Sequence, residues 1–208
     1  MQKPTINTKA EVAKSVIIGE GSKIMNCKIG ENVKIGKNCI VGNNTLIEDN
    51  VVLADGARVW HNSHIRNDAK IGRDCNIGDC AYIDSGVELG DECKVQNGVL
   101  IYHGVKVGNG VFFGPNCLTT NDLWPRARKP GGGVRGEEDW EVGTITIEDD
   151  ASIGAGAVLV ANNITIGKAS MIGSGAIVIK DVKPYTTVVG TPAREIGEIK
   201  DKKEYSES

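Results

Sequence analysis

Aliphatic or aromatic residues recur at every sixth position of this chain. The run comprises Ile29, Ile35, Val41, Ile47, Leu53, Val59, Ile65, Ile71, Ile77, Ile83, Leu89, Val95, Ile101, Val107 and Phe113. This period fits neither the 3.6-residue repeat of a helix nor the two-residue alternation of a simple strand. Three such units make a coil of about 18 residues with three flat faces, so residues one coil apart lie one above another, about 4.8 Å apart. The sequence therefore predicts an all-β solenoid of parallel strands.

Two other phases of the repeat support this prediction. Small or slender residues stand two positions before each large one: Cys27, Val33, Cys39, Thr45, Val51, Ala57, Ser63, Ala69, Cys75, Ala81, Val87, Cys93, Val99, Val105, Val111 and Cys117. A narrow prism needs such an alternation of large and small side chains to reach normal packing density. Three positions after the large residues, Asn, Asp and Gly predominate. These residues tolerate the left-handed backbone that a repeated tight corner requires.

Composition adds limits on organisation and partners. The 208 residues favour one rod-like domain over 15–197, with a lead-in over 1–14, a loop over 118–145 and a charged tail over 198–208. A net charge of −3 with mixed signs gives no support for nucleic-acid binding. We find no apolar run suited to a signal peptide or a bilayer span, so we expect a cytoplasmic protein without a membrane partner.

The six cysteines do not indicate a metal site. Five of them occupy the small interior phase and are expected to be buried thiols. Cys75 and Cys93 stack closely enough for a disulfide in principle, but a reducing cytosol argues against one. Cys80 alone falls on a corner, and its role is left open. Since no C-x-x-C pair occurs, no zinc site is expected.

The repeat stops after Cys117 and resumes at Ile147. A loop this long in a repeat protein is usually functional or disordered. Its composition favours a function, since it combines a basic cluster with two tryptophans that can anchor it: Arg126, Arg128, Lys129 and Arg135, with Trp124 and Trp140. A second irregularity is one extra residue near Asn162.

Several motifs resemble a known family. The hexapeptide repeats, the extruded loop and the ending from Lys180 to Ile196 (K-D-V-x-x-x-x-x-V-x-G-x-P-A-R-x-I) resemble the left-handed β-helix acyltransferases. Three further motifs are similar to those of N-acetyltransferases acting on the 3-amino group of a UDP- or dTDP-linked sugar. They are R-V-W-H-x-x-H from Arg58, K-V-Q-N from Lys94, and G-P-N-x-x-x-T-N-D-L-W-P-R from Gly114. The resemblance covers about residues 55–197, and the coils before residue 55 depart from it.

The stacking rule places a candidate catalytic pair at one corner, independently of the family. His103 and Asn121 are one coil apart, so Asn121 is expected above His103, with Ser85 below it. Acyl transfer to an amine needs a group that takes the proton and a donor for the oxyanion that develops on the thioester. His103 is a candidate for the first role. Asn121, beside the sugar amine in the enzymes that the chain resembles, is a candidate for orienting the amine or polarising the carbonyl.

The resemblance also implies binding residues and partners. His61, His64, Gln96, Asn97 and Arg126 are expected to bind the nucleotide-linked sugar, with solvated corners as the alternative for the two histidines. The histidine spacing does not reproduce the triple-histidine metal site of β-helical carbonic anhydrases, so we expect no metal.

For the acyl donor, the resemblance implies a groove between subunits of a homotrimer. Acetyl-CoA would lie there against Ala155, Gly173, Lys180, Pro192 and Arg194. The leading function from sequence is an acetyl-CoA-dependent N-acetyltransferase for a nucleotide-linked amino sugar. An O-acetyltransferase of the same fold and a non-enzymatic β-solenoid scaffold are the alternatives.

Overall fold

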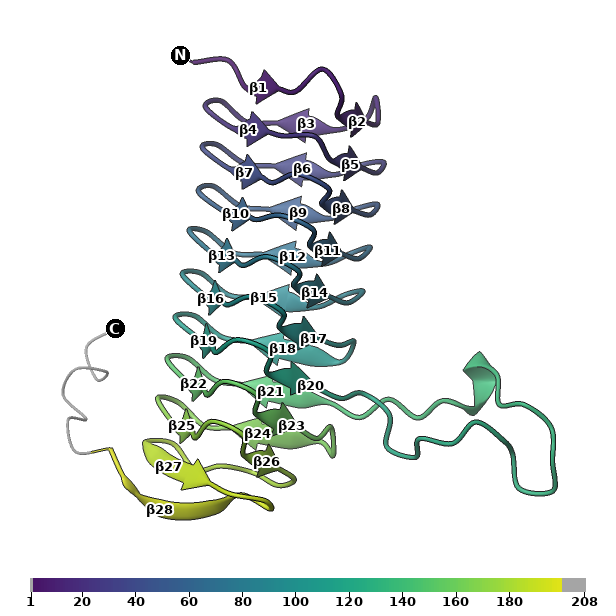
Figure 1. The fold of residues 1–208 in the computed structure, drawn as a ribbon, viewed down its shortest axis with the longest axis vertical. Helices are drawn as coiled ribbons and strands as arrows, with labels where there is room; N and C mark the ends of the chain where they lie inside the picture. Colours follow the sequence, from purple (N-terminus) through teal and green to yellow (C-terminus); the bar gives the residue numbers. More distant parts are fainter. Residues whose placement is uncertain (1, 200–208) are drawn as a thin grey trace.

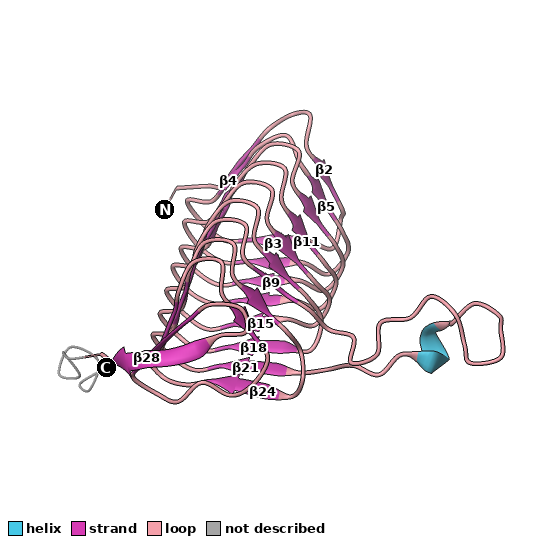
Figure 2. Ribbon diagram, turned by 60° about the horizontal axis from the view of Figure 1, so that its bottom comes forward, coloured by secondary structure: helices cyan, strands magenta, loops and turns pink. Residues whose placement is uncertain are grey.

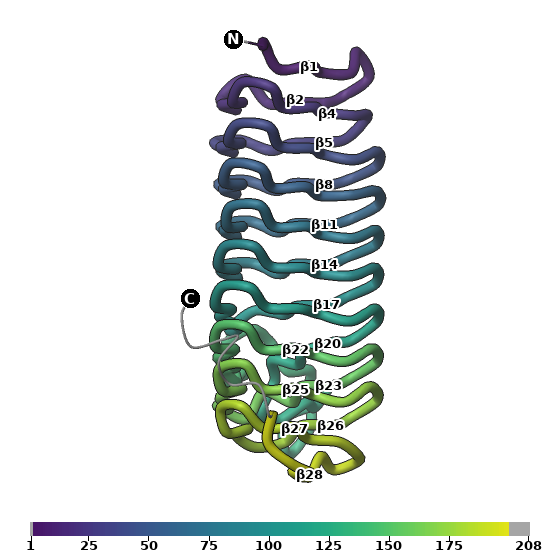
Figure 3. The backbone as a smooth tube through the Cα atoms, turned by 90° about the vertical axis from the view of Figure 1, so that its left-hand side faces the viewer, coloured from purple at the N-terminus to yellow at the C-terminus, as the bar shows by residue number. Residues whose placement is uncertain are grey.

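The computed structural model describes residues 2–199, and they form a parallel β-solenoid whose coils stack into a column (Figures 1 and 3). Each coil contributes one short strand to each of three sheets, named faces A, B and C. The predicted all-β solenoid of hexapeptide repeats is confirmed. The strands that follow are two to five residues long, because each is one side of a narrow triangular coil.

Face A contains β1 (Thr5–Ile6), β4 (Lys23–Ile24), β7 (Ile40–Val41), β10 (Arg58–Val59), β13 (Asn76–Ile77), β16 (Lys94–Val95), β19 (Phe112–Phe113), β22 (Ser152–Ile153), β25 (Met171–Ile172), β27 (Thr186–Val189) and β28 (Arg194–Glu198). Face B contains β2 (Glu11–Val12), β5 (Lys28–Ile29), β8 (Leu46–Ile47), β11 (His64–Ile65), β14 (Tyr82–Ile83), β17 (Leu100–Ile101), β20 (Leu118–Thr119), β23 (Val158–Leu159) and β26 (Ile177–Val178). Face C contains β3 (Ile17–Ile18), β6 (Lys34–Ile35), β9 (Val52–Leu53), β12 (Lys70–Ile71), β15 (Glu88–Leu89), β18 (Val105–Val107), β21 (Ile145–Ile147) and β24 (Ile164–Ile166).

The register between coils follows the predicted 18-residue step over the central part of the column. Arg58, for example, pairs with Asn76. Near the start Glu11 pairs with Lys28, one residue short of that step, because the corner between β4 and β5 is one residue shorter than the corners on either side of it. Near the end Ser152 pairs with Met171, one residue beyond it. The extra residue is accommodated between β23 and β24, where Asn163 adopts the left-handed conformation with φ of 54°.

The core is the line of large and small residues that the sequence predicts. Large side chains such as Ile77 and Phe113 are at most 1% exposed. The five cysteines of the small phase are buried free thiols, and Cys80 is exposed. Burial raises the pKa of the Cys27 thiol to about 11 and that of Cys117 to about 12, which makes these thiols poor nucleophiles.

The corners also follow the prediction. Asn, Asp and Gly at the third position after the large residue have φ between about 54° and 87°, as Asp74 and Gly104 show at the two ends of this range. At many corners an Asn or Asp side chain accepts the backbone N–H of the corner one coil earlier. Asp49 accepts the N–H of Glu31 in this way, at 2.7 Å. These bonds build ladders along the corners and tie adjacent coils together.

The two ends of the column differ. Residues 5–12, expected to belong to a lead-in, already contain β1 and β2 of the first coil, which pair with β4 and β5. At the other end β28 runs antiparallel to β27 and lies across the last coil (Figure 1). The predicted charged tail lies outside the described residues from residue 200 onward. Among the described residues, no helix has the length and apolar character needed to cross a membrane.

Candidate active site

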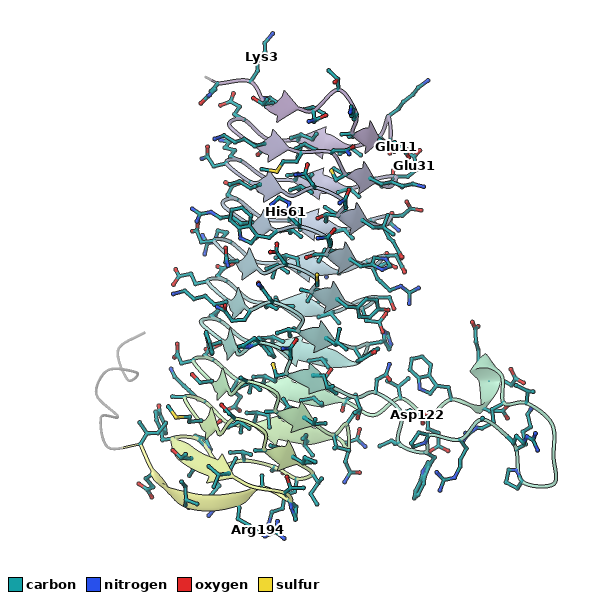
Figure 4. All side chains as sticks on the ribbon, viewed as in Figure 1. Lys3, Glu11, Glu31, His61, Asp122 and Arg194 are labelled. Carbon is teal, nitrogen blue, oxygen red and sulfur yellow. The ribbon has the colours of Figure 1, made fainter. Side chains whose placement is uncertain are left out.

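A long arm leaves the column at the corner between faces B and C (Figures 1 and 2). It starts after β20 and returns at β21, and its root is an antiparallel bridge between Asp122 and Val142. The Gly143 N–H donates to the Asn121 carbonyl at 3.0 Å. Figure 4 shows Asp122 at this root, on the side of the column from which the arm projects. The predicted loop is therefore a hairpin-like arm with a fixed base.

Much of the arm's basic cluster is used inside the arm itself. Lys129 pairs with Asp139 at 2.7 Å, and the hydrogen bond and charge of Asp139 raise the pKa of this lysine. Arg135 donates to the carbonyls of Trp124 and Asp139. Arg126, predicted to bind substrate, is exposed and donates to the carbonyl of Pro125. The short helix η1 (Glu137–Asp139) completes the distal part of the arm.

A cavity of about 650 Å³ lies between the arm root and face B. Its walls come from the outward side of β17 and β20, the start of the arm, and the corners after β23 and β26. They comprise Leu100, Tyr102, Leu118, Thr119, Thr120, Asn121, Asp122, Leu123, Pro125, Val160, Ala161, Asn162 and Ile179. Among these described residues Asp122 is the one charged side chain. The cavity is thus mainly apolar, with two amides (Asn121 and Asn162) and three hydroxyls (Tyr102, Thr119 and Thr120) as neutral polar groups.

The regular 18-residue step, from which the stacking of Asn121 on His103 was predicted, ends within this corner. The regular step holds as far as Leu118, which pairs with Leu100. Beyond it, however, the chain that pairs with β18 is β21, so that Val105 lies beside Ile145. The space next to Gly104 is filled by Val142 and Gly143, from the returning end of the arm. The 18-residue rule fails here because the arm is inserted within the coil.

His103 is held by the coil beneath it. Its Nδ1 is 2.7 Å from the Ser85 carbonyl oxygen and 3.4 Å from the Ser85 hydroxyl, so the predicted neighbourhood with Ser85 is present. On its other side the imidazole contacts Trp140, with ring centroids 5.7 Å apart. Trp140 thus packs the base of the arm against this corner.

His61 has a different environment, at the corner between faces A and B. Its Nδ1 accepts the Asn43 backbone N–H at 2.8 Å, and the backbone N–H of His61 donates to the Asp79 carboxylate at 2.8 Å. The imidazole therefore takes the place of an Asn or Asp side chain in the corner ladder. Asn97 belongs to the same ladder, since its Oδ1 accepts the N–H of Asp79 at 3.0 Å. Gln96 is half-buried beside it.

His64 belongs to an ion-pair network on face B. Its Nε2 is 2.6 Å from Glu48, and Arg66 bridges Glu48 and Asp84. Burial alone would raise the pKa of Glu48, but hydrogen bonds from His64 and Asn67 and the charge of Arg66 outweigh it and lower this pKa. The network was not evident from the sequence. The structure reveals it through Asp84, whose carboxylate is only 5% exposed.

Aromatic rings connect this network to the cavity. His64 packs edge-on against Tyr82, and Tyr82 packs against Tyr102, with both centroid distances 5.5 Å. Tyr102 lines the cavity. His64 is therefore continuous with the cavity along face B, whereas His61, Gln96 and Asn97 lie across that face from it.

The predicted coenzyme residues follow two features near the C-terminal end. At the corner between faces A and B, the side-chain ladder gives way to Gly154–Gly156 and Gly173–Gly175. A Cβ added at Gly156 or Gly175 would meet nothing within 4 Å, so this corner is open at these two turns, whereas a Cβ at Gly173 would lie 2.6 Å from the Val189 side chain. The second feature is a cavity of about 170 Å³ beside β28, lined by Lys180, Lys183 and Arg194 among others. Pro192 is exposed between these two features.

We searched the described residues for side chains grouped as metal ligands. Within residues 2–199, no group of three or more His, Cys, Asp or Glu side chains is arranged to hold a metal ion. The arrangement instead provides a mainly apolar cavity, a neighbouring imidazole, an amide and an open glycine-rich corner.

Two segments of the chain match family models. Residues 12–107 match the model described as the GMPPB C-terminal domain, and residues 144–180 match the hexapeptide repeat of succinyl-transferase. The two matches lie on either side of the arm.

Relatives with similar sequences align over parts of the chain. A Schizosaccharomyces pombe protein named as a candidate acetyltransferase is 41% identical over 97 residues, which cover 45% of this chain and 42% of that protein. A 2,3,4,5-tetrahydropyridine-2,6-dicarboxylate N-acetyltransferase of Brevibacillus brevis is 47% identical over 58 residues, covering 28% of this chain and 24% of the enzyme. A serine acetyltransferase of Bacillus pumilus is 51% identical over 51 residues, covering 24% and 23%. The chain thus spans less than half the length of each of these relatives.

Solved structures match over the whole column. The UDP-N-acetylglucosamine acyltransferase of Campylobacter jejuni aligns with a TM-score of 0.66 at 16% identity, covering 100% of this chain and 78% of that one. The Francisella novicida enzyme of the same name aligns with a TM-score of 0.57 at 20% identity, covering 98% and 72%. At these identities the likeness concerns the fold. The chain is a hexapeptide-repeat β-solenoid, and the relatives that share its sequence are named as acetyltransferases.

Proposed function

We propose that this protein is an acetyl-CoA-dependent acetyltransferase. The observation that carries the proposal is the cavity at the arm root, with Asn121 in its wall and the His103 corner beside it. In the proposed reaction the acceptor amine attacks the thioester carbonyl, the carbon–sulfur bond breaks, and coenzyme A leaves as the thiol. The amine loses one proton to a base. His103 is the candidate base, and the amide of Asn121 is the candidate donor to the carbonyl oxygen.

Within this class, we propose the amino group of a nucleotide-linked amino sugar as the acceptor. Support comes from the Q-N and T-N-D-L-W-P-R motifs, which resemble those of N-acetyltransferases acting on such sugars. The cavity adds a chemical reason. Its described lining carries one charge, the carboxylate of Asp122, so it suits a neutral or amine-bearing sugar ring better than a diphosphate. The phosphates would lie outside it, towards the exposed Arg126.

The coenzyme fits the glycine-rich corner. Its pantetheine arm is narrow and carries amides, and side-chain-free turns at Gly156 and Gly175 allow backbone groups to approach it closely. Lys180 and Arg194, which line the same small cavity, are candidates for its phosphates. Ala155, Gly173 and Pro192 would line the route between them.

The two groups of proposed site residues lie on different corners of one chain. His103 and Asn121 are at the corner between faces B and C, whereas Gln96, Asn97 and Ala155 are at the corner between faces A and B. A homotrimer would bring one corner of a subunit against the other corner of its neighbour. The outward side of face B is apolar from β17 to β26, and the corner after β26 adds the 43%-exposed Ile179, so this part of the surface is suited to such packing.

An O-acetyltransferase is the second candidate, because one of the aligned relatives is a serine acetyltransferase. The enzymes of this fold that acetylate hydroxyl groups generally use a histidine of the loop. The segment from Leu118 to Ile145 contains none. This difference favours the amine as acceptor.

The test is release of free thiol from acetyl-CoA with a panel of acceptors. The panel contains UDP- and dTDP-linked 3-amino and 4-amino sugars, the corresponding hydroxyl sugars, and serine. We expect turnover with one amino sugar and background rates with its hydroxyl counterpart. Turnover only with a hydroxyl acceptor would establish the second candidate instead. Thiol release with none of them, together with no detectable coenzyme A binding, would favour the non-enzymatic scaffold.

Variants test the assignment of the site. Asn121→Ala and His103→Gln are expected to lower kcat/KM by about 100-fold each, with unchanged Tm. Ser152→Ala is a matched control, because this half-buried residue belongs to face A rather than to the cavity. If both site variants keep full kcat/KM, the reaction takes place elsewhere on the solenoid.

A further inference from the structure

The carbonyl of Ser85 has an unusual partner for its place in the repeat. At the equivalent place one coil earlier, the Asn67 carbonyl accepts the backbone N–H of Gly86 at 3.0 Å. The same kind of bond joins the Asp79 carbonyl to the N–H of Gly98 at 2.9 Å. The Ser85 carbonyl instead receives the His103 imidazole at 2.7 Å. This exchange of a backbone donor for a side-chain donor follows the arm's insertion into the next coil.

That contact determines the tautomer of His103. A carbonyl oxygen only accepts hydrogen bonds, so a neutral His103 in this contact must carry its proton on Nδ1. Its Nε2 then has a free lone pair. A base that is to take a proton from an acceptor needs such a lone pair.

Asp84 holds both sides of this contact in place. Its Oδ1 accepts the backbone N–H of Ser85 at 2.7 Å, and its Oδ2 accepts the backbone N–H of His103 at 3.2 Å. Arg66 at 3.1 Å and the hydroxyl of Tyr82 at 3.3 Å bind the same carboxylate. At 5% exposure, a carboxylate is costly unless it is paired in this way. The carboxylate thus fixes the backbone that presents the Ser85 carbonyl to the imidazole.

We infer that Asp84 is a positioning residue which, through the Ser85 carbonyl, holds His103 as the Nδ1–H tautomer with Nε2 free as the proton acceptor. The role of Nε2 as the base rests on the proposed function. The assignment of the His103 tautomer does not depend on that function. In the step itself, the neutral amine attacks the thioester carbonyl, the N–H bond of the ammonium formed by this attack breaks, and a bond from that proton to Nε2 forms. The imidazole becomes an imidazolium, still bound to Ser85 through Nδ1–H.

His61 provides an internal reference for this inference. Its Nδ1 accepts the Asn43 N–H, so a neutral His61 must carry its proton on Nε2. The structure thus assigns opposite tautomers to two of the chain's three histidines. Nitrogen chemical shifts distinguish the two forms directly.

The experiment is ¹⁵N NMR of the full chain labelled at histidine, at mildly alkaline pH, with each imidazole assigned by its substitution with glutamine. We expect His103 to show a protonated Nδ1 and a bare Nε2, and His61 to show the reverse. In Asp84→Asn, the His103 signals should move towards the mixture of tautomers seen in free histidine. Glu48→Gln, a change in the same ion-pair network that leaves both Asp84 bonds to backbone N–H groups, should not move them. A wild-type His103 protonated on Nε2 would overturn the inference.

Activity supplies the second measurement. With the acceptor found by thiol release, Asp84→Asn should lower kcat by about tenfold or more and leave the KM for acetyl-CoA unchanged. Ser152→Ala, on face A and outside this network, should retain activity. An unchanged kcat in folded Asp84→Asn would refute the positioning role.

If Asp84→Asn does not fold, the tautomer of His103 in the wild-type protein still tests the structural part of the inference. The kcat measurement is then made with Arg66→Gln, whose kcat is expected to fall. An unchanged kcat of this variant would count against the positioning role of Asp84. If the tautomers are as expected but no acceptor is acetylated, the proposed function fails while the assignment of the tautomer stands.

Discussion

The corner that carries His61 and the corner that carries His103 use the same turn but leave their side chains in opposite states. In the regular ladder around His61, the side chain at each step bonds to the backbone of the adjacent coil. At His103, the inserted arm interrupts the ladder, and Nδ1 of the imidazole donates to a backbone carbonyl instead of accepting a backbone N–H, which leaves the ring's lone pair on Nε2. Regular repetition thus uses up the hydrogen-bonding groups that chemistry would need. An interruption of the repeat leaves such a group free.

Removing the arm should produce the largest difference between the two regions. Asp122 and Val142 already pair as an antiparallel bridge, so Leu123–Glu141 can be replaced by Asn-Gly, which favours a tight hairpin turn. The solenoid is expected to keep its circular dichroism spectrum and its Tm to within a few degrees, because the arm lies outside the core. Acetyl transfer should fall by at least about 100-fold, since the deletion removes Leu123 and Pro125 from the cavity lining.

The control for this deletion is the same Asn-Gly replacement confined to the arm's tip, Lys129–Gly133, which lies away from the cavity. Full activity without the larger segment would mean that the arm is not part of the site.

Blocking the open glycine-rich corner should have the next largest effect. Ala155→Trp places a bulky side chain along the proposed coenzyme route, and the KM for acetyl-CoA should rise by about tenfold or more, equivalent to about 1.4 kcal/mol of binding. The acceptor KM should change much less. Initial-rate kinetics with each substrate varied in turn would show this. Lys94→Trp, on the exposed side of face A, is the matched bulky control.

Changes to the ladder should affect stability rather than chemistry. His61→Ala removes the acceptor for the Asn43 N–H and is expected to cost about 1 kcal/mol of unfolding free energy. His61→Asp supplies an oxygen acceptor in the same place, as Asp49 does for Glu31, and should recover most of that loss. Urea unfolding would measure both. Equal stability of the two variants would show that the hydrogen bond accepted at this position does not stabilise the fold.

Glu48 should give a smaller, pH-dependent effect. Because its pKa in the folded chain is lowered, its stabilising contribution is fully present above its usual pKa of 4.5 and is lost as the pH falls through the lower folded value. Glu48→Gln should therefore lower stability by up to about 1 kcal/mol at pH near 7 and by little in strong acid. Urea midpoints for the two proteins across this range would converge towards low pH. A constant difference would exclude this ion pair as its cause.

The smallest expected effect concerns the thiols. Cys80 is exposed, while the other five cysteines are buried. A thiol reagent should label Cys80 alone in the native protein and the remaining thiols only on unfolding. Cys80→Ser should show no native labelling; rapid labelling of that variant would reveal opening of the core.

Particular residues show how far sequence reasoning reached. The six-residue phase of Ile77 and Phe113 predicted their burial because a side chain's direction in a coil depends only on its position in the repeat. The corner conformation of Asp74 was predictable for the same reason. Sequence also singled out Asn121, which lines the cavity, and the neighbourhood of His103 and Ser85. The 18-residue step ends within this corner, because the returning arm supplies Gly143 beside Gly104, and the stacking of Asn121 on His103 stays a prediction.

The sequence by itself determined the solenoid, its core and its corners, because these depend on local pattern and on contacts between residues one coil apart. Only the tertiary structure decided where the arm returns, that Asp84 is a buried anchor, and that Nδ1 of His61 meets a backbone N–H whereas Nδ1 of His103 meets a backbone carbonyl. Those features depend on non-repeating contacts among the arm, the coil beneath it and the face B network. A periodic pattern carries no information about such contacts, and the candidate chemistry of this protein depends on them.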